Sequence, residues 1–185
     1  MNANIWFKIS SALVLTAVLT VLGLYQTHAS TLSPGPAGGQ LKGGPDHAIL
    51  YKRAVILLDN AEKKLNARYT AEAAALLKES NSLFTLLQKE LGPEQRQRLL
   101  NPKEEQQEGI NQKLFSDGCM AADRLMKSAA DKEKKSTQIE ASQPEQSLKL
   151  QQEAREEYEQ AHKSFIKAQI YVLRNQQMLF RFLTP

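Results

Sequence analysis

Glu159 and His162 are the residues whose types and spacing come nearest to a known chemistry. Glu159-Gln160-Ala161-His162 has the E-x-x-H pattern that carboxylate-bridged di-iron bundles direct into their cores. Such a centre needs two copies of the pattern and two further glutamates, and the sequence contains one copy. If Tyr158 and Ala161 face a core, Glu159 lies on the outer face of its helix. The sequence therefore predicts a solvated carboxylate beside a surface histidine, and no metal site.

No other motif indicates a cofactor or a catalytic nucleophile. A covalently attached haem needs C-x-x-C-H, and Cys119 is the only cysteine. A haem held without covalent bonds by His162 and a methionine is compatible with the sequence, but the methionines occur among apolar residues, where they fill gaps in a core. No serine stands between the glycines of a nucleophile elbow. We therefore expect a protein that is not an enzyme and that binds no cofactor.

Cys119 itself has two interpretations. Phe115, Cys119, Ala122, Met126 and Ala129 recur at helical spacing, which favours a buried and inert thiol. A lone cysteine in an oxidising compartment can pair only with a second chain. An intermolecular disulfide through Cys119 is therefore the alternative.

The amino-terminal residues indicate where the protein works. Lys8 precedes an apolar run from Ile9 to Tyr25, and an A-x-A-like exit, T-H-A, precedes Ser30. This order is typical of a secretory signal peptide, although the run also approaches the ~20 residues that span a bilayer. Residues 1–29 are thus predicted to be a cleaved signal peptide or an uncleaved membrane anchor. No Lys or Arg follows Lys8 until Lys42, so in both cases the rest of the chain is expected outside the cytoplasm, whether periplasmic, secreted or membrane-anchored.

A linker is predicted to follow this segment. Residues 30–46, STLSPGPAGGQLKGGPD, contain five of the nine glycines and three of the seven prolines. No periodic apolar face is present there, which predicts a flexible segment ahead of a helical domain at residues 47–185. The net charge of +4 is too small to indicate a nucleic-acid partner.

From His47 onward, apolar residues recur at three- and four-residue steps, and no alternating run indicates a strand. A first helix is predicted after a cap at Asp46 and a second from Thr70. The link around Arg68 is short, so these two helices are expected to be antiparallel. Gly92-Pro93 is predicted to end the second helix, with a short helix following it to Leu100.

Two further helices have start signals. Asn101-Pro102-Lys103-Glu104 offers a cap, a proline at the first helical position and a glutamate at the third, which predicts a helix to about Lys135. Ser116-Asp117-Gly118 is expected to be a point where it can bend or break. Residues 134–144 are predicted to be a loop, and Ser142 with Glu145 to form the capping box of the last helix. The expected fold is an all-α, antiparallel bundle of about four main helices.

The last helix has the clearest pattern. Two sets of residues recur every seventh position, three positions apart: Tyr158, Phe165, Val172 and Leu179, and Ala154, Ala161, Ala168 and Asn175. This spacing predicts the seam of a coiled-coil-like pair, in which alanine permits close approach and Asn175 sets the register.

A second apolar stripe lies on the other side of the same helix and consists of Ile166, Ile170, Leu173, Phe180 and Leu183. A helix with two apolar faces is either central to its own bundle or half-covered by a partner. The first alternative places the stripe in the core. The second makes Ile166, Ile170, Leu173 and Phe180 partner-binding residues, with Asn175 setting register. It predicts an exported, non-enzymatic interaction protein that binds a protein partner or a second copy of itself through a helix face.

A different function is implied by a short resemblance. Residues 91–100, LGPEQRQRLL, resemble the L-T-x-x-Q helix start of the periplasmic stress- and metal-sensing helical hairpins of the Spy and CpxP group. Gly92 stands at the threonine position, and the pattern occurs once, so we assign no family on these ten residues. A periplasmic bundle that binds a small ligand or a metal, as sensors do, is kept as the alternative function.

Overall fold

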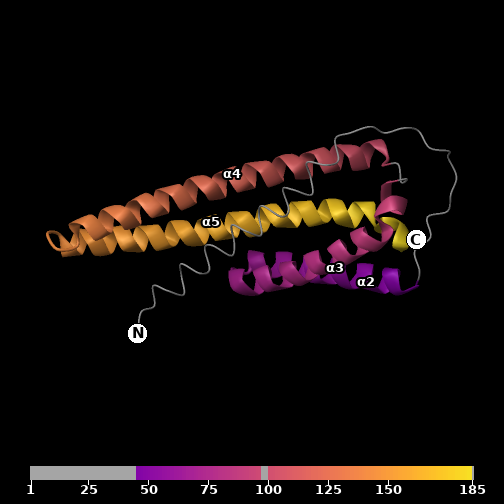
Figure 1. The fold of residues 1–185 in the computed structure, drawn as a ribbon, viewed down its shortest axis with the longest axis horizontal. Helices are drawn as coiled ribbons and strands as arrows, with labels where there is room; N and C mark the ends of the chain where they lie inside the picture. Colours follow the sequence, from indigo (N-terminus) through magenta and orange to yellow (C-terminus); the bar gives the residue numbers. More distant parts are fainter. Residues whose placement is uncertain (1–44, 97–99, 185) are drawn as a thin grey trace. The chain divides into compact units, whose positions relative to one another are not determined.

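The computed structural model describes residues 45–96 and 100–184, with the side chains of residues 46–92 and 100–184. The predicted leader and the linker up to residue 44 lie outside the described residues. Four long helices make up nearly all of the described chain: α2 (Pro45–Asn66), α3 (Thr70–Arg96), α4 (Pro102–Ile139) and α5 (Pro144–Leu179), with a 3-10 turn, η2 (Arg181–Leu183), at the end (Figure 1). None of these helices is both long and apolar enough to cross a membrane. For the part of the chain that the structure describes, the prediction of an all-α fold with four main helices is confirmed.

Helices α2 and α3 form an antiparallel hairpin, as predicted (Figure 1). The chain reverses at Arg68, whose φ of 68° lies in the left-handed region that often terminates a helix. The Tyr69 N–H then donates to the Lys64 carbonyl at 2.9 Å. Inside the hairpin, the buried Ser80 hydroxyl donates to the Ala54 carbonyl at 2.8 Å. Helix α2 begins at Pro45, so Asp46 lies in its first turn and does not precede the helix.

The predicted end of the second helix at Gly92-Pro93 is wrong. Helix α3 continues through both residues to Arg96. Leu91 is 3% exposed and belongs to the core cluster, so this turn is held by packing. Tertiary contacts of this kind outweigh the local preference of Gly and Pro to end a helix.

Helix α4 starts where the sequence predicts, but it ends four residues beyond the predicted end at Lys135. Asn101 Oδ1 accepts from the N–H groups of Lys103 and Glu104, and Glu104 Oε2 accepts from the Asn101 N–H at 3.1 Å, which completes the capping box. The helix extends past Lys135 to Ile139. The buried Ser147 hydroxyl donates to the Ser136 carbonyl at 2.9 Å, which pairs this last turn with α5.

The capping box predicted for Ser142 and Glu145 does not form. The residue that precedes α5 is Gln143, which makes no side-chain capping hydrogen bond. The Ser142 hydroxyl donates backward, to the Ile139 carbonyl at 3.3 Å. The link is therefore only residues 140–143, because the end of α4 already uses the residues expected to form a loop.

Helices α4 and α5 pair along a seam of small residues. The seam is made of buried positions seven residues apart: Phe115, Ala122, Ala129 and Ser136 of α4, and Ser147, Ala154, Ala161, Ala168 and Asn175 of α5. Gly118 does not break α4. A Cβ atom added to Gly118 would lie 2.9 Å from the Ala168 Cβ, so glycine is the residue that lets the two backbones approach this closely. Of the two sets predicted for the seam of the last helix, the one with Ala154, Ala161, Ala168 and Asn175 packs on α4, whereas Tyr158 and Phe165 of the other set are only half-buried.

The apolar core lies between the α2–α3 hairpin and the second half of α5. It contains α5 residues only from Ile166 onward, and it includes Leu58, Phe84, Leu87 and Phe180. Figure 1 shows α5 between α4 on one side and the α2–α3 hairpin on the other. The first half of α5 contributes no residue to this core, and its buried Ser147, Ala154 and Ala161 belong to the seam with α4.

Candidate functional site: a polar cleft and an uncovered helix flank

The second stripe of α5 is buried inside the chain. Ile166, Ile170, Leu173 and Phe180 are 2%, 3%, 3% and 0% exposed and pack against α2 and α3. The structure thus shows the core alternative for these residues. A partner would contact them only after the α2–α3 hairpin had moved away from α5.

Asn175 is buried in the seam between α4 and α5. Its Oδ1 accepts from Asn111 Nδ2 at 2.7 Å, and Gln107 Nε2 donates to Asn111 Oδ1 at 3.0 Å. This chain of amides satisfies Asn111 and Asn175 in one alignment of the helices, so the pair specifies the register of α4 on α5.

Cys119 is a half-buried free thiol on α4. Burial raises its pKa, which reduces the thiolate fraction that attacks a disulfide or an alkylating reagent. The intermolecular disulfide through Cys119 stays a prediction.

Glu159 and His162 are both exposed on α5. Partial burial of the ring lowers the pKa of His162. Within residues 45–96 and 100–184, no group of three or more His, Cys, Asp and Glu side chains is placed to hold a metal ion.

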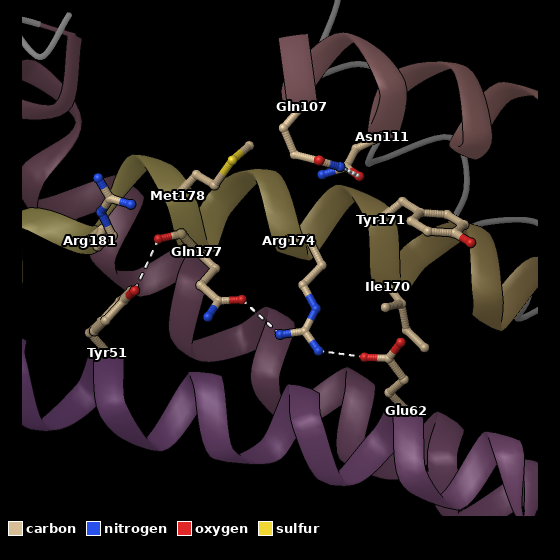
Figure 2. Close-up of a pocket in the computed structure, with 10 residues that line it drawn as sticks. All are labelled: Tyr51, Glu62, Gln107, Asn111, Ile170, Tyr171, Arg174, Gln177, Met178 and Arg181. Carbon is tan, nitrogen blue, oxygen red and sulfur yellow. Dashed lines mark hydrogen bonds and ion pairs between the residues drawn. The ribbon is translucent and has the colours of Figure 1, made fainter. Parts of the chain in front are cut away.

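A cleft of about 440 Å³ lies where α2 and α4 flank the carboxyl-terminal half of α5 (Figure 2). Its lining is mostly amide, guanidinium and aromatic groups. The lining residues are Tyr51, Glu62, Gln107, Asn111, Ile170, Tyr171, Arg174, Gln177, Met178 and Arg181.

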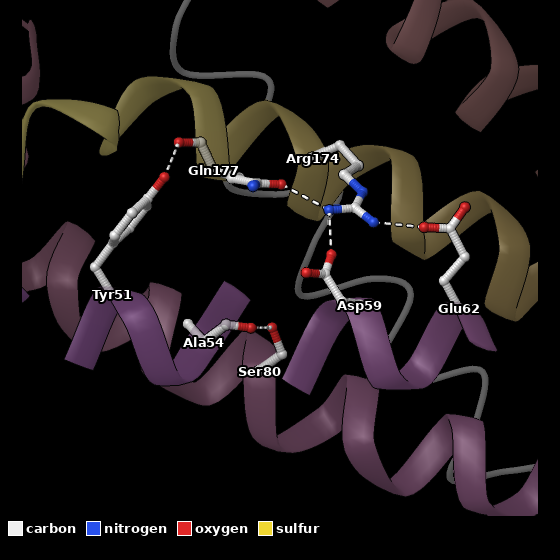
Figure 3. Close-up of polar contacts among 7 residues, drawn as sticks. All are labelled: Tyr51, Ala54, Asp59, Glu62, Ser80, Arg174 and Gln177. Atoms are coloured by element: carbon white, nitrogen blue, oxygen red, sulfur yellow. Dashed lines mark hydrogen bonds and ion pairs between the residues drawn. The ribbon is translucent and has the colours of Figure 1, made fainter. Parts of the chain in front are cut away.

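Arg174 joins α5 to α2 at the floor of this cleft (Figure 3). Its guanidinium donates to Asp59 Oδ1 at 2.8 Å, to Glu62 Oε2 and to Gln177 Oε1 at 2.8 Å. Burial alone would lower the pKa of Arg174, but the hydrogen bonds that its guanidinium donates to Glu62 and Asp59 outweigh burial and raise the pKa. Arg174 therefore remains charged, and its charge is already neutralised within the protein.

Two further contacts involve residues that line the cleft. The Tyr51 hydroxyl donates to the Gln177 carbonyl at 3.1 Å. Arg181 pairs with Glu104 Oε1 at 2.8 Å, and Glu104 is 7% exposed. The lining thus offers groups that bind a polar molecule, and it contains no histidine, cysteine or serine that would act as a general base or a nucleophile.

Replacing Arg174 by leucine tests how strongly the cleft holds α2 on α5. The change leaves Asp59 and Glu62 facing one another without a cation, and we expect the free energy of unfolding to fall by about 1–2 kcal/mol. Both carboxylates are 45–46% exposed, which keeps the loss moderate. Urea denaturation followed by circular dichroism measures it, with Arg124→Leu on the exposed face of α4 as the control. An equal loss in both variants would contradict a role for the Arg174 ion pairs.

A second candidate surface is one side of the α4–α5 pair. Tyr158 Oη donates to Glu133 Oε2 at 3.2 Å, so these two residues mark one flank of the seam. Lys132, which binds Glu153 and Glu157, marks the other. We name the first the Tyr158 flank. By helical spacing it also carries the half-buried Cys119, Met126 and Phe165 and the exposed Asp123, Ala130, Leu148, Arg155 and His162.

Burial and the Glu133 carboxylate raise the pKa of Tyr158, so the phenol stays protonated and donates its hydrogen bond. Leu148 is 66% exposed, the largest value among the large apolar side chains of the described residues. The Tyr158 flank thus combines apolar side chains with few charges on a part of α5 that α2 and α3 do not cover.

The described fold defines an all-helical protein in which α5 is shared by a long two-helix pair and a compact apolar core. No protein-family model, curated protein or solved structure matches the chain.

Sequence reasoning missed the cleft, because its lining comes from α2, α4 and α5, which are far apart in the sequence. Among its lining residues, Ile170 had a local signal as a member of the second apolar stripe of α5, and that signal pointed to an apolar contact. The Tyr158 flank had a usable signal in the repeat of Tyr158 and Phe165 beside Ala154 and Ala161.

Proposed function

We propose that this chain is an exported, non-enzymatic interaction protein of the cell envelope, which binds a protein partner or a second copy of itself through a helix face. The face is the Tyr158 flank of the α4–α5 pair. The observation that carries the proposal is the row of partly exposed apolar side chains on this flank, which on α5 runs from Leu148 to Phe165, ahead of the residues that enter the core with α2 and α3.

The chemistry of the flank suits a helix as its ligand. Met126, Tyr158 and Phe165 are half-buried along the edge of the seam and leave part of their apolar surface in contact with water. An amphipathic helix recognises such a row through apolar residues three and four positions apart. The adaptable thioether of Met126 and the broad ring of Phe165 are side chains that contribute strongly to interfaces.

The rigidity of the α4–α5 pair beneath the flank also favours binding. The small residues of the seam hold α4 and α5 close together, and the Asn111–Asn175 hydrogen bond specifies their register. The flank is thereby presented as a preformed surface, which reduces the entropy lost on association.

Location outside the cytoplasm is part of the proposal and rests on the sequence. The apolar run after Lys8 and the exit before Ser30 suit export, whether the leader is cleaved or kept as an anchor. A surface that binds protein by helix contacts needs no cofactor, which fits a chain without a cofactor motif.

Site-specific photocrosslinking in the cells that make the protein tests this function. A photoreactive amino acid at Ala130 or Leu148, both exposed on the Tyr158 flank, is expected to yield one discrete protein adduct. The same amino acid at Ile49 or Ile56 of α2, which are 64% and 58% exposed, is the matched control and is expected to yield none. Adducts of equal yield from both surfaces, or none from Ala130 and Leu148, would contradict the proposal.

The cleft supports a second candidate function, the binding of a small polar molecule. Its volume of about 440 Å³ lies in the range of ligand sites, and its amides and guanidinium groups suit hydrogen-bonding ligands. This function predicts that an added ligand raises the unfolding temperature, because it binds only the folded chain.

A further inference from the structure

We propose that the exposed side of α2 docks on an anionic lipid surface, with its cations against the headgroups and two isoleucines inserted between them. This inference goes beyond the proposed function, because it assigns a second surface and a partner of a different class. The composition of that side of α2 and the chain that precedes it carry the inference.

The surface consists of the exposed side chains of α2 between residues 49 and 63. They recur at steps of three or four residues, so they lie on one side of the helix. We name this surface the α2 face, and its members are Ile49, Lys52, Arg53, Ile56, Asn60 and Lys63. From end to end it is about 21 Å long, since each helical residue rises about 1.5 Å.

Two isoleucines form the apolar part of the α2 face. Ile49 and Ile56 are 64% and 58% exposed and stand seven residues apart, so they project from the same side of the helix. The core takes its α2 residues from the opposite side, among them Ala54, Leu58 and Ala61. The two isoleucines thus add nothing to the core, and helices that lie on a bilayer insert such side chains at headgroup level.

The charges of the α2 face select the kind of lipid. Its charged members are all cationic, and Lys52 and Lys63 make no ion pair with another residue in the part of the chain that the structure describes. Arg53 binds Glu79 of α3. The face therefore offers positive charge that the protein does not neutralise, which favours anionic over zwitterionic headgroups.

The acidic residues in this stretch of α2 lie outside the face. Asp59 and Glu62 point toward α5, where both bind Arg174 (Figure 3). Their charges are thus directed to a neighbouring helix and away from the surface that would meet the headgroups.

The chain ahead of α2 favours the same partner. Residues 30–45 contain Lys42 and no acidic residue. Residues 30–44 join the predicted leader to α2, and a flexible linker of this length spans about 20 Å on average. If the leader is kept as an anchor, the linker holds the α2 face near the bilayer, and the high effective concentration strengthens a weak contact. If the leader is cleaved, the face binds the lipid surface by itself.

Fluorescence quenching on vesicles tests this docking with the full protein in the form recovered from cells. A bimane label is attached to Asn60→Cys in a Cys119→Ser background, which leaves both isoleucines in place. The vesicles contain a lipid with a nitroxide on its headgroup and consist of phosphatidylcholine, either alone or with about one third phosphatidylglycerol. We expect quenching with phosphatidylglycerol to be at least about threefold stronger, and to lose this excess at about 1 M salt, where charges are screened within about 3 Å.

Charge reversal locates the contact on the α2 face. Lys52→Glu combined with Lys63→Glu is expected to raise the lipid concentration at half-maximal quenching at least about tenfold, because two attractions become repulsions. Lys163→Glu combined with Lys167→Glu, both exposed on α5, alters the net charge equally and is the matched control. We expect a change of less than about threefold in that control, since only distant charges are altered.

Three outcomes would overturn the inference: equal quenching in the two kinds of vesicle, no quenching in either, or equal losses in the two double variants. A discrete protein adduct from a photoreactive amino acid at Ile56 would overturn it as well, because it would assign the α2 face to a protein. The quenching experiment does not involve the Tyr158 flank, so the failure of this inference is distinguishable from a failure of the proposed function.

Discussion

Replacing Phe180 by alanine is expected to lower the free energy of unfolding by about 3–5 kcal/mol, because a large and fully buried side chain is lost. Phe180 is fully buried and stacks on Phe84 at 6.5 Å between ring centroids, and the Phe182 ring centroid lies 6.3 Å from that of Phe180. Truncation removes these contacts and leaves a cavity between α3 and α5. Urea denaturation at constant temperature measures the loss.

Two variants make this result specific. Phe180→Leu keeps most of the volume and is expected to cost about 1–1.5 kcal/mol. Ile49→Ala removes an apolar side chain that is 64% exposed and is expected to change the free energy by less than about 0.5 kcal/mol. A loss below about 1 kcal/mol for Phe180→Ala would show that Phe180 is not packed within the chain, and it would favour the second stripe of α5 as a partner surface.

The same reasoning applies to Ile170, which is 3% exposed in the same core. Ile170→Glu places a charge in the apolar core, and the neighbouring Arg174 is already paired with Asp59 and Glu62, so this variant is expected to unfold the domain. A loss of partner binding in that variant would therefore report on folding. Variants of exposed residues on the Tyr158 flank avoid this difficulty, because they leave the core intact.

Replacing Gly118 by leucine is the second large expected effect, a loss of about 3 kcal/mol or more of unfolding free energy. Even a methyl group at Gly118 would lie 2.9 Å from the Ala168 Cβ and 3.5 Å from the Ser164 carbonyl oxygen. These neighbours are a short side chain and backbone, which cannot rotate away, so α4 and α5 must separate. Thermal unfolding followed by circular dichroism measures the effect.

Gly109 of the same helix is the matched control. A Cβ at Gly109 has no neighbour within 4 Å, so Gly109→Ala is expected to stabilise the protein by about 0.5–1 kcal/mol through helix propensity alone. Gly118→Ala has the same intrinsic gain but is expected to be net destabilising by about 1 kcal/mol. Adding Ala168→Gly to it should recover part of the loss, because it removes the opposing methyl group. Equal stabilisation by both alanine variants would refute the close approach of α4 and α5.

Variants of Phe180 and Gly118 perturb different halves of α5, so their effects on function can be compared. Phe180 supports the core with α2 and α3, and Gly118 supports the seam with α4. If the Tyr158 flank is the binding surface, mild loosening of the seam by Gly118→Ala should weaken binding more than an equally destabilising change in the core.

Much of the local structure follows from the sequence alone. The capping box at Asn101 was predictable, because cap, proline and glutamate all act within one helical turn. The buried line of Ala154, Ala161, Ala168 and Asn175 was predictable for a similar reason, since a seven-residue repeat places its members on one face of one helix.

Other features depended on contacts between distant residues. Three features contradict the local preference of their residues: α4 ends only at Ile139, α3 continues through Gly92, and α4 is unbroken at Gly118. Each is stabilised by packing or by a hydrogen bond to another helix. Glycine is a residue type that often interrupts a helix, but Gly118 instead allows α4 to approach α5 closely. Only the position of Ala168 in the fold shows which of these two roles Gly118 has.

The sequence by itself determined that the chain is helical, where its seam lies and that α5 has two apolar faces. Only the tertiary structure decided what covers each face: α4 covers the alanine line, and α2 with α3 covers the stripe that contains Ile166 and Phe180. The physical reason is that helical periodicity records which side chains avoid water, whereas the identity of the covering surface depends on shape and charge contributed by residues elsewhere in the chain.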